Sequence, residues 1–472
     1  MPSKIKPVLI IGAGVAGEIV AEILSKSQSK DFLPIGFVDD DPEKQNLILY
    51  GLPVLGTRKN IPALVSRHHI EEIIIAIPSA SGKVVTEIVE ICHQSKARLK
   101  ILPGFYDLIT GKIKTSNIRD IEVDDLLGRD PVSLDLEKIA GYLTNQVVLV
   151  TGAGGSIGSE LCRQAANFYP KKLILLGRGE NSIYEMDLEL KEKHPELKFD
   201  SEIGDIKDQA RMNQIFYRHK PNVVFHAAAH KHVPFMERCP GEALKNNVFG
   251  SLRLAESACR SGTGTFVLIS SDKAVKPASV MGATKRVAEM AIQYMQTKGS
   301  TRFTAVRFGN VLGSRGSVIP LFKRQIARGG PLTITHPDMV RYFMTTAEAA
   351  QLVIQAGAQA QGGEIFILDM GKPVKIVDLA KNLIQLSGLE PEIDIPIRFT
   401  GIRQGEKLVE QLIGEGEESI PTNHERIFAV SESGGDFSML ESFLEVLERT
   451  NLNLEEQEVI GLLQSVLPNF KK

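Results

Sequence analysis

The chain has 472 residues, of which 43% are hydrophobic and 24% charged, and its formal net charge is −2. This length exceeds one ordinary core and indicates two or three domains, while the near-neutral charge excludes a general attraction to nucleic acid or anionic membranes. The four cysteines, Cys92, Cys162, Cys239 and Cys259, form no paired spacing and no metal pattern, so we expect a cytoplasmic protein. No signal peptide and no run of 18 apolar residues occur, so no membrane span is expected.

Two segments share one plan, an apolar strand followed by a glycine turn and a helix, and they begin at Val8 and Val147. β-Branched runs recur after each of them: PIGFVDD, EEIIIAIP and LKILP in the first half, KKLILLG, NVVFHAAA, GTFVLISS and TRFTAVRFGN in the second. Such runs are typical of buried parallel strands joined by crossover helices. The sequence therefore predicts an α/β protein with two tandem Rossmann-like, doubly wound parallel sheets.

The predicted organisation has three parts. Residues 1–117 form an N-terminal Rossmann-like domain, residues 118–145 form a linker with charge, glycine and proline but little periodicity, and residues 146–472 form the catalytic domain. After about residue 315 the pattern loosens, which indicates a small substrate-binding lobe over the carboxyl edge of the second sheet. The tail from Asn451 is predicted to be one amphipathic helix.

The first glycine turn fits the dinucleotide fingerprint. Gly12, Gly14 and Gly17 are spaced G-x-G-x-x-G, and Asp39 follows about twenty residues later. No acid–base cluster occurs at the later strand ends of this half. We interpret the turn as a nucleotide-binding or regulatory site, or as a structural duplicate without a ligand.

The second glycine turn has a G-x-x-G-x-x-G spacing at Gly152, Gly155 and Gly158. Glycines at this place let the backbone approach a pyrophosphate at the helix N-terminus, and Ser156 and Ile157 begin that helix. The alternative is a strand–helix turn that needs glycine only for packing.

The next two strand ends bear on the choice of dinucleotide. An acid after the second strand would hold the adenosine ribose, whereas an arginine would favour a 2′-phosphate. Arg178 comes first there and Glu180 follows. This order does not decide between NAD and NADP, although the arginine favours NADP. Asp205 and Ile206 are placed to meet adenine, although Asp205 can also cap a helix. The expected cofactor residues also include Ala227 and Ala228.

The strand FVLISSDK ends with a hydroxyl, an acid and a base, Ser271, Asp272 and Lys273. Lys285 follows twelve residues after Lys273, at the place of the lysine in a Tyr-x-x-x-Lys pair, and Met281 stands at the tyrosine position. A thioether cannot take a proton, so we expect the proton chemistry on Asp272 and Lys273. Two lysines and an oxidised nicotinamide are expected to lower the pKa of Lys273. The alternative is a polar loop in which Ser271 or Asp272 caps a helix.

Motifs in order over more than half of the chain carry a resemblance: TGAGGSIGSE, GRGENSIYEM, FHAAAHKHVPFME, NNVFGS, SSDKAVKPASVMGATK, RFGNVLGSRGSVIPLF, MVRYFMTTAEAA and GIRQGEKLVEQL. The chain resembles the long-form, capsular-polysaccharide (CapD-like) UDP-N-acetylglucosamine 4,6-dehydratases, a branch of the extended short-chain dehydrogenase/reductases. Its N-terminal half resembles the second Rossmann-like domain of long members.

The resemblance implies three steps on a recycled NAD or NADP. Hydride leaves sugar C4, the resulting ketone allows loss of the C5 proton and the C6 hydroxyl, and the hydride returns to C6. By position, Lys273 would be the base at C5, Asp272 the acid for the departing hydroxyl, Ser271 a hydrogen-bond partner of O4, and Lys285 an orienting residue for the cofactor. Met281 matches the long members that retain the C5 configuration.

The resemblance also implies a grip on a UDP-sugar substrate. Asn310, Arg315, Ser317 and Arg403 resemble the family's diphosphate contacts, Glu406 is placed for the nucleoside ribose, and Lys231 is expected near the substrate. Arginine suits a diphosphate because its guanidinium group can donate two parallel hydrogen bonds to one phosphate.

The histidines His226, His230 and His232 suggest a metal site, but no acid or cysteine completes the set. We favour structural hydrogen bonding or a cofactor wall, and we expect no metal. Two other functions stay open, a nucleotide-sugar C4 epimerase and a non-catalytic dinucleotide-binding sensor. A homo-oligomer is expected from the resemblance.

Overall fold

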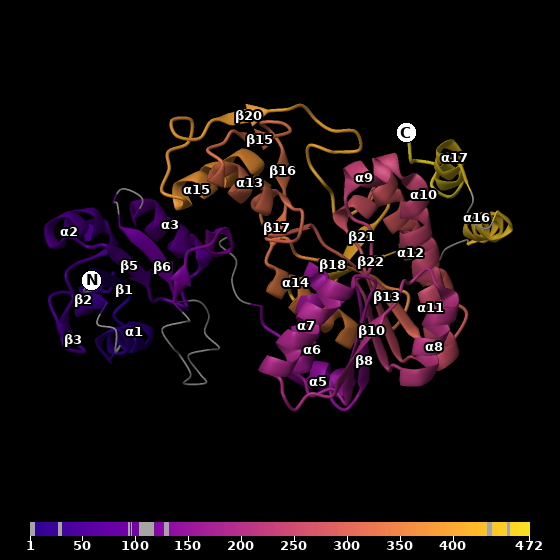
Figure 1. The fold of residues 1–472 in the computed structure, drawn as a ribbon, viewed down its shortest axis with the longest axis horizontal. Coiled ribbons are helices and arrows are strands. Elements are labelled where there is room, and N and C mark those ends of the chain that lie inside the picture. Colours follow the sequence, from indigo (N-terminus) through magenta and orange to yellow (C-terminus); the bar gives the residue numbers. More distant parts are fainter. Residues whose placement is uncertain are drawn as a thin grey trace. The chain divides into compact units, whose positions relative to one another are not determined.

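The computed structural model describes residues 5–26, 31–92, 95, 97–102, 118–126, 132–431, 437–450 and 454–472. The chain divides into two compact units. Unit 1 comprises Met1–Asp130, Arg328–Pro331 and Leu379–Pro396, and unit 2 comprises Pro131–Ala327, Leu332–Asp378 and Ile397–Lys472. Each unit is built around a sheet of its own (Figure 1).

The sheet of unit 1 has the strand order β2-β1-β5-β6-β7. Its parallel strands are β1 (Lys6–Ile11), β2 (Phe32–Val38), β5 (Glu72–Ile75) and β6 (Arg98–Ile101), and β7 (Arg119–Asp120) pairs antiparallel with β6. Helix α1 (Val15–Lys26) packs on one face, and α2 (Ile61–His68) and α3 (Gly82–Cys92) pack on the other. A two-stranded ribbon, β3 (Ile48–Leu49) with β4 (Leu52–Pro53), completes the strands of this unit.

The main sheet of unit 2 has the order β10-β9-β8-β11-β12-β13-β18-β22-β21. Seven strands run parallel: β8 (Val147–Thr151), β9 (Lys172–Gly177), β10 (Phe199–Ile203), β11 (Val223–His226), β12 (Thr265–Ile269), β13 (Arg302–Arg307) and β18 (Ile365–Leu368). Two antiparallel strands, β22 (Ile427–Ser431) and β21 (Glu418–Pro421), close one edge. The order reverses between β8 and β11, and ligands of α/β sheets bind outside the carboxyl ends of strands at such a point.

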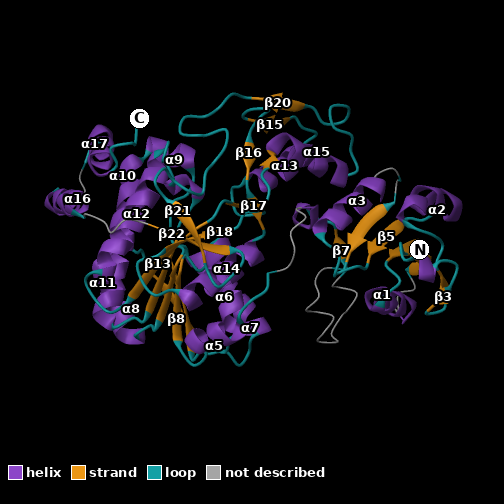
Figure 2. Cartoon of the chain, turned by 180° about the vertical axis from the view of Figure 1, so that it is seen from behind, coloured by secondary structure: helices purple, strands orange, loops and turns teal. Residues whose placement is uncertain are grey.

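Helices cover both faces of this sheet (Figure 2). One face packs on α5 (Leu136–Leu143), α6 (Ser156–Ala166), α7 (Glu180–Lys193) and α14 (Thr346–Gln359). The other face packs on α8 (Gln209–His219), α11 (Ser251–Ser261) and α12 (Val280–Gln296). A further apolar cluster joins α12 to α9 (Val233–Arg238), α10 (Pro240–Ala243), the π-helical turn Leu244–Gly250, α16 (Ser438–Arg449) and α17 (Glu456–Val466).

Short strand pairs build the lobe above the carboxyl edge. They are β14 (Asn310–Val311) with β17 (Phe343–Met344), β15 (Leu332–Ile334) with β20 (Ile397–Phe399), and β16 (Val340–Arg341) with β19 (Val374–Lys375). Helices α13 (Val318–Ala327) and α15 (Ile376–Leu386) lie in the same stretch of sequence.

The predicted fold class, two Rossmann-like parallel sheets in an α/β chain, is confirmed. Three local features differ from the sequence analysis. The range predicted as a linker carries β7 and α5, and the sequence after residue 315 supplies β18, β22 and β21 to the main sheet as well as the lobe. The tail helix α17 runs over Glu456–Val466, because it begins only after its N-cap residue Glu455; residues 451–453, where the predicted helix starts, lie outside the described residues. The domain ends stay a prediction.

Among the described residues, no helix is both long enough and apolar enough to cross a bilayer.

Candidate active site

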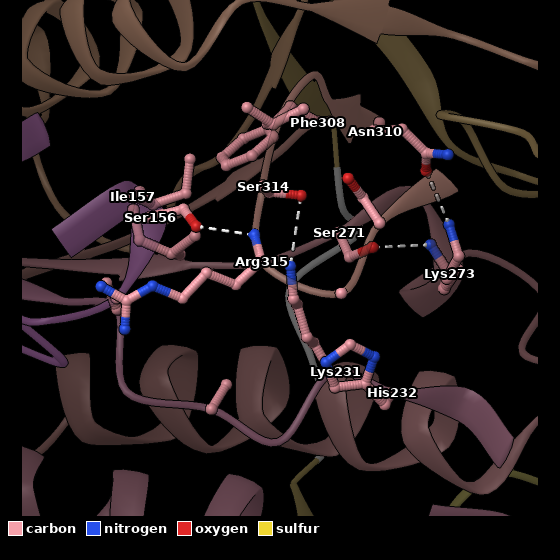
Figure 3. Close-up of a pocket in the computed structure, with 18 of the residues that line it drawn as sticks. Ser156, Ile157, Lys231, His232, Ser271, Lys273, Phe308, Asn310, Ser314 and Arg315 are labelled. Carbon is pink, nitrogen blue, oxygen red and sulfur yellow. Dashed lines mark hydrogen bonds between the residues drawn. The ribbon is translucent and has the colours of Figure 1, made fainter. Parts of the chain in front are cut away.

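A cavity of about 610 Å³ opens at the carboxyl edge of the main sheet of unit 2. Its walls come from the second glycine turn, the segment after β11, the end of β12, the start of α12 and the loop after β14. Figure 3 shows the polar side chains of these segments gathered around one space. The topology therefore brings the predicted cofactor turn and the predicted catalytic strand to one site.

The glycine turn is shaped so that side chains would not fit. Gly152 has a φ of +64°, and a Cβ there would lie 2.9 Å from the carbonyl oxygen of Ala227. A Cβ on Gly158 would lie 2.1 Å from the carbonyl oxygen of Gly152. Gly155 is the N-cap of α6, whose first turn lines the cavity. This close-packed turn at a helix N-terminus fits the pyrophosphate of a dinucleotide.

The predicted adenosine residues lie together at the ends of β9 and β10. Arg178 Nη1 lies 3.6 Å from Asp205 Oδ2, and Glu180 is the first residue of α7. The backbone N–H of Lys207 donates to Asp205 Oδ1 at 3.0 Å, so this carboxylate also closes its own turn. Ile206 is buried. Because an arginine and two acids are all present, the arrangement is compatible with NAD and with NADP.

Ser271, Asp272 and Lys273 form one hydrogen-bonded chain. Ser271 Oγ donates to Asp272 Oδ1 at 2.8 Å, and Lys273 Nζ donates to the same oxygen at 2.9 Å. Lys273 Nζ also donates to Asn310 Oδ1 at 3.3 Å (Figure 3). Ser271 and Lys273 line the cavity, whereas Asp272 is fully buried behind them and does not line it. The backbone N–H of Lys273 also donates to Ser271 Oγ at 3.2 Å, so Ser271 caps this short helical turn, as the alternative predicted.

The expected lowering of the pKa of Lys273 is wrong for the chain by itself. Burial alone would lower it, but the negative charges of Asp272 and Glu410 outweigh burial and raise the pKa of Lys273 above its ordinary value. The positive neighbours of Lys273 were the basis of the expected lowering, and the carboxylate of Glu410 was not among the charges considered.

Lys285 and Met281 face the cavity from the first two turns of α12. Lys285 Nζ donates to the carbonyl oxygen of Ile269, the last residue of β12, at 2.6 Å. Burial lowers the pKa of Lys285 to about 8. Met281 is 3% exposed and belongs to the apolar cluster around α12, so the tyrosine position of related reductases is filled by a packed thioether.

A buried ion network lies behind the end of β12. Arg307, at the end of β13, is fully buried and donates to both oxygens of Glu289 at 2.9 and 2.8 Å and to Glu417 at 2.7 Å. Ser270 Oγ donates to Glu289 Oε1 at 2.5 Å. The arginine lowers the pKa of Glu289 to about 2 against the opposing effect of burial. These contacts fix the backbone that presents Ser271.

Of the three histidines, His226 agrees best with the predicted structural role. Its ring lies between Thr151 Oγ1 at 2.7 Å and Ser251 Oγ at 2.8 Å, and burial lowers its pKa to about 3, so the ring is neutral. His230 and His232 line the cavity. Within the residues that the structure describes, no group of three histidine, cysteine or acidic side chains could hold a metal ion.

Four of the predicted substrate residues, Lys231, Asn310, Arg315 and Ser317, line the cavity. Lys231 Nζ donates to Ser314 Oγ at 3.3 Å, and burial, with the charge of Lys273, lowers its pKa. The backbone N–H of Arg315 donates to Ser156 Oγ at 3.0 Å, and its side chain is 64% exposed. Ser317 Oγ is buried without a hydrogen-bond partner among the described residues. Asn310 holds Lys273, as described above.

Arg403 and Glu406 do not line the cavity. The backbone N–H of Arg403 donates to Glu406 Oε2 at 3.3 Å, and Glu406 pairs with Arg341 Nη2 at 3.7 Å. The cavity therefore gathers most, but not all, of the predicted site. The predicted residues that line it are Gly155, Ser156, Ile157, Gly158, Ala227, Lys231, Ser271, Lys273, Met281, Lys285, Asn310, Arg315 and Ser317, and those that do not are Gly152, Arg178, Glu180, Asp205, Ile206, Ala228, Asp272, Arg403 and Glu406.

Sequence reasoning missed Glu410. This carboxylate is 4% exposed and reaches to 3.7 Å from Lys273 Nζ. It lies in the motif GIRQGEKLVEQL, which was recognised, but nothing in the spacing of that motif brings this glutamate to the end of β12.

Family models match both parts of the chain. A model described as polysaccharide biosynthesis protein matches residues 148–432, and a model described as CoA-binding domain matches residues 3–103. The chain is 51% identical over 438 residues to the probable polysaccharide biosynthesis protein EpsC of Bacillus subtilis (strain 168), an alignment that covers 93% of this chain and 73% of that protein. It is 52% identical over 426 residues to the capsular polysaccharide biosynthesis protein CapD of Staphylococcus aureus, with 90% and 71% covered.

More distant relatives match between 57% and 64% of this chain. A UDP-glucose 4-epimerase of Rickettsia rickettsii (strain Sheila Smith) is 33% identical over 309 residues, covering 64% of this chain and 87% of that protein. The solved structure of Pen from Bacillus thuringiensis aligns with a TM-score of 0.58 and 32% identity over 62% of this chain and 92% of that one. A dTDP-glucose 4,6-dehydratase of Streptomyces venezuelae, solved with NAD bound, shares the fold at a TM-score of 0.51 and 23% identity, covering 57% and 88%. By these matches the chain belongs to the polysaccharide biosynthesis protein family typified by EpsC and CapD, with the fold of the short-chain dehydrogenase/reductases.

Proposed function

We propose that the chain is a nucleotide-sugar 4,6-dehydratase that converts UDP-N-acetylglucosamine to the UDP-4-keto-6-deoxy sugar with the C5 configuration retained. The observation that supports this most is the chain Ser271–Asp272–Lys273 at the wall of a cavity in which Met281 fills the tyrosine position. An acid and an amine joined by a hydrogen bond can catalyse the removal of water, because this reaction needs a proton donor and a proton acceptor close together.

NAD or NADP is the proposed cofactor, and the glycine turn fits its pyrophosphate. When bound, the dinucleotide supplies reversible uptake of the hydride that leaves C4 and returns to C6. The turn Gly152–Gly158 would hold the phosphates, and Lys285, anchored on the carbonyl of Ile269, would orient the nicotinamide end. All other chemistry then consists of proton movements on residues of this chain.

The proton of the C4 hydroxyl is proposed to leave through Ser271. Met281 offers no base, whereas Ser271 faces the cavity and donates to Asp272 Oδ1 at 2.8 Å. The serine can accept the substrate proton and pass its own to the carboxylate, so that Asp272 becomes a carboxylic acid without touching the sugar.

Lys273, in its neutral form, is proposed to remove the C5 proton once C4 is a ketone. Asp272 returns its proton, again through Ser271, to the C6 hydroxyl, and the C6–O bond breaks with release of water. The ammonium of Lys273 then gives its proton back to C5 after hydride has reached C6. The protons balance, since water carries away the C4 hydroxyl proton and the C6 hydroxyl. Because Lys273 removes the C5 proton and returns it on the same face of the sugar, the configuration at C5 is retained.

The diphosphate of the substrate is proposed to lie near Lys231, Arg315 and Ser317, which supply two cationic groups and a hydroxyl at the cavity wall. Asn310 holds Lys273. The roles of Arg403 at the diphosphate and of Glu406 at the nucleoside ribose stay predictions from the resemblance, since neither residue lines the cavity. A cytoplasmic location and a homo-oligomer stay predictions from the sequence.

A nucleotide-sugar C4 epimerase is the second candidate, because a relative at 33% identity carries that name. An epimerase needs a base at O4 but no acid for O6. The buried Asp272 hydrogen-bonded to Lys273 favours the dehydratase.

Mass spectrometry of UDP-N-acetylglucosamine after incubation with the protein and NAD or NADP separates these functions. A dehydratase gives a product lighter by one water with no net reduction of the cofactor. An epimerase gives a product of unchanged mass, and a binding sensor gives no product. Either of the last two results would contradict the proposed function.

A further inference from the structure

A carboxylate from the lobe is buried beside the amine of Lys273. Glu410 Oε1 lies 3.7 Å from Lys273 Nζ, and Glu410 Oε2 lies 3.9 Å from Lys407 Nζ. Among the described residues, Oε2 has no hydrogen-bond partner. A buried carboxylate is costly unless its charge is compensated, so the place of Glu410 between two lysines indicates an electrostatic role.

The segment that carries Glu410 is held firmly. Lys407 Nζ donates to two backbone carbonyls of the segment that follows Lys273, at 3.0 and 2.6 Å. The buried Arg341 donates to the carbonyls of Lys407 and Leu408 at 2.8 and 2.9 Å. The lobe is thereby tied to the backbone next to the catalytic strand, and Glu410 has a fixed position relative to Lys273.

We infer that Glu410 is a positioning residue for Lys273, supplying from the lobe a second negative charge that holds the amine at the cavity wall beside Asn310. Glu410 does not line the cavity, so it acts through Lys273 and not on the substrate. This role deepens the proposed function, and it affects the reaction only if Lys273 is the base there.

The charges that face Lys273 come from several elements. Asp272 and Glu410 are negative, whereas Lys231, Arg341 and Lys407 are positive. The two carboxylates prevail and raise the pKa of Lys273 in spite of burial. The amine is therefore a stronger base for a carbon-bound proton, and a smaller fraction of it is neutral at a given pH.

Competitive acetylation of the whole protein tests this role without any substrate. Trace acetic anhydride reacts only with neutral amines, and the labelling of each lysine is read by mass spectrometry relative to Lys83, which is 84% exposed. Replacing Glu410 by Gln should raise the labelling of Lys273 several-fold, because loss of the negative charge lowers its pKa and a larger fraction of the amine is neutral. Labelling of Lys231 in the same cavity should not rise, whereas a loosened site would raise both.

Glu415→Gln is the matched control. Glu415 lies in the same loop and pairs with Lys276 at 2.7 Å, but it is 86% exposed, so its loss should leave the labelling of Lys273 unchanged. Unchanged labelling of Lys273 in Glu410→Gln would overturn the inference, as would a parallel rise at Lys231. If Glu410→Gln does not fold, Glu410→Asp should give a smaller rise at Lys273, and no rise would again overturn it.

The dehydration assay separates this inference from the proposed function. If the wild-type protein dehydrates the substrate, Glu410→Gln should shift the acidic limb of its kcat profile to lower pH and change KM little. If the wild type forms no product, the proposed function fails, while the labelling result still decides the role of Glu410.

Discussion

The two glycine turns of this chain are built alike. The first glycine of each has a positive φ, +104° at Gly12 and +64° at Gly152. A Cβ on the last glycine, Gly17 or Gly158, would lie 2.0 or 2.1 Å from the carbonyl oxygen of the first. The backbone of the two turns therefore gives no reason to prefer one as the catalytic cofactor site.

The surroundings of the two turns differ. In unit 1, Asp39 accepts from the turn's own Ala13 N–H at 2.8 Å and from Lys44 Nζ at 3.1 Å. The carboxylate of Asp39 therefore already binds an amide of the turn, and its negative charge would repel an incoming phosphate. In unit 2 the turn opens on a cavity that also holds Ser271 and Lys273. The glycine pattern therefore determines the backbone shape of such a turn, whereas the residues at the later strand ends determine which function the turn can serve.

Loss of the amine at position 273 should have the largest effect. Lys273→Gln should lower dehydration about 100-fold or more, because general base catalysis at C5 is removed. The measurement is the rate of product formation by mass spectrometry. Lys276→Gln is the control, since that lysine pairs with Glu415 outside the cavity and should keep activity within about twofold. A Lys273→Gln protein as fast as the control would remove the proposed base.

An alanine substitution in each glycine turn tests whether only the second turn binds the dinucleotide. Gly155→Ala should weaken binding of the dinucleotide about tenfold, because the backbone there must approach the phosphates. Gly14→Ala should leave binding and activity unchanged, and its Cβ would meet nothing within 4 Å, so its fold is preserved. Calorimetric titration with NAD and NADP measures both variants. If Gly14→Ala loses activity and Gly155→Ala does not, the roles assigned to the two turns are reversed.

The charge of Asp39 should stabilise unit 1 above acidic pH. Partial burial would raise its pKa, but hydrogen bonds from the Asp41 and Ala13 N–H groups and from Lys44 lower it. A lowered folded-state pKa means stability that is present above the unfolded-state value and lost as pH falls through the folded-state value. Asp39→Asn should cost about 1 kcal/mol near neutral pH, and the difference should shrink in acid. Denaturant unfolding monitored at several pH values measures it, and a difference that grows in acid would contradict this sign.

The smallest effect is expected at the tyrosine position. Met281→Leu keeps the apolar volume of a packed residue and removes no proton chemistry, so dehydration should stay within about threefold of wild type. A loss as large as that of Lys273→Gln would show that the thioether itself takes part in the reaction.

Local patterns revealed most of the fold and part of the site. The β-branched runs predicted the parallel strands of both sheets, because buried strands need apolar side chains on both faces. The pattern after residue 315 did not reveal β18, although its four residues are buried like those of β11, which was predicted.

The missing parts of the site depend on contacts distant in sequence. The burial of Asp272 behind Ser271 and Lys273 is an exception, because it belongs to the short turn that ends β12, and no expectation from the sequence covered it. Glu410 reaches Lys273 only because Lys407 and Arg341 tie the lobe down, and no spacing within one motif encodes that contact. For this reason the pKa of Lys273 is raised in the chain without a dinucleotide, whereas the expected lowering included an oxidised nicotinamide.

Turnover of UDP-N-acetylglucosamine in D2O, followed by NMR of the product, tests the central claim most directly. If hydride moves from C4 to C6 within one site while Lys273 exchanges its proton with solvent, the product should carry a C6 methyl group free of deuterium and a deuteron at C5. A product that keeps its C6 hydroxyl, or a methyl group that contains solvent deuterium, would contradict the account.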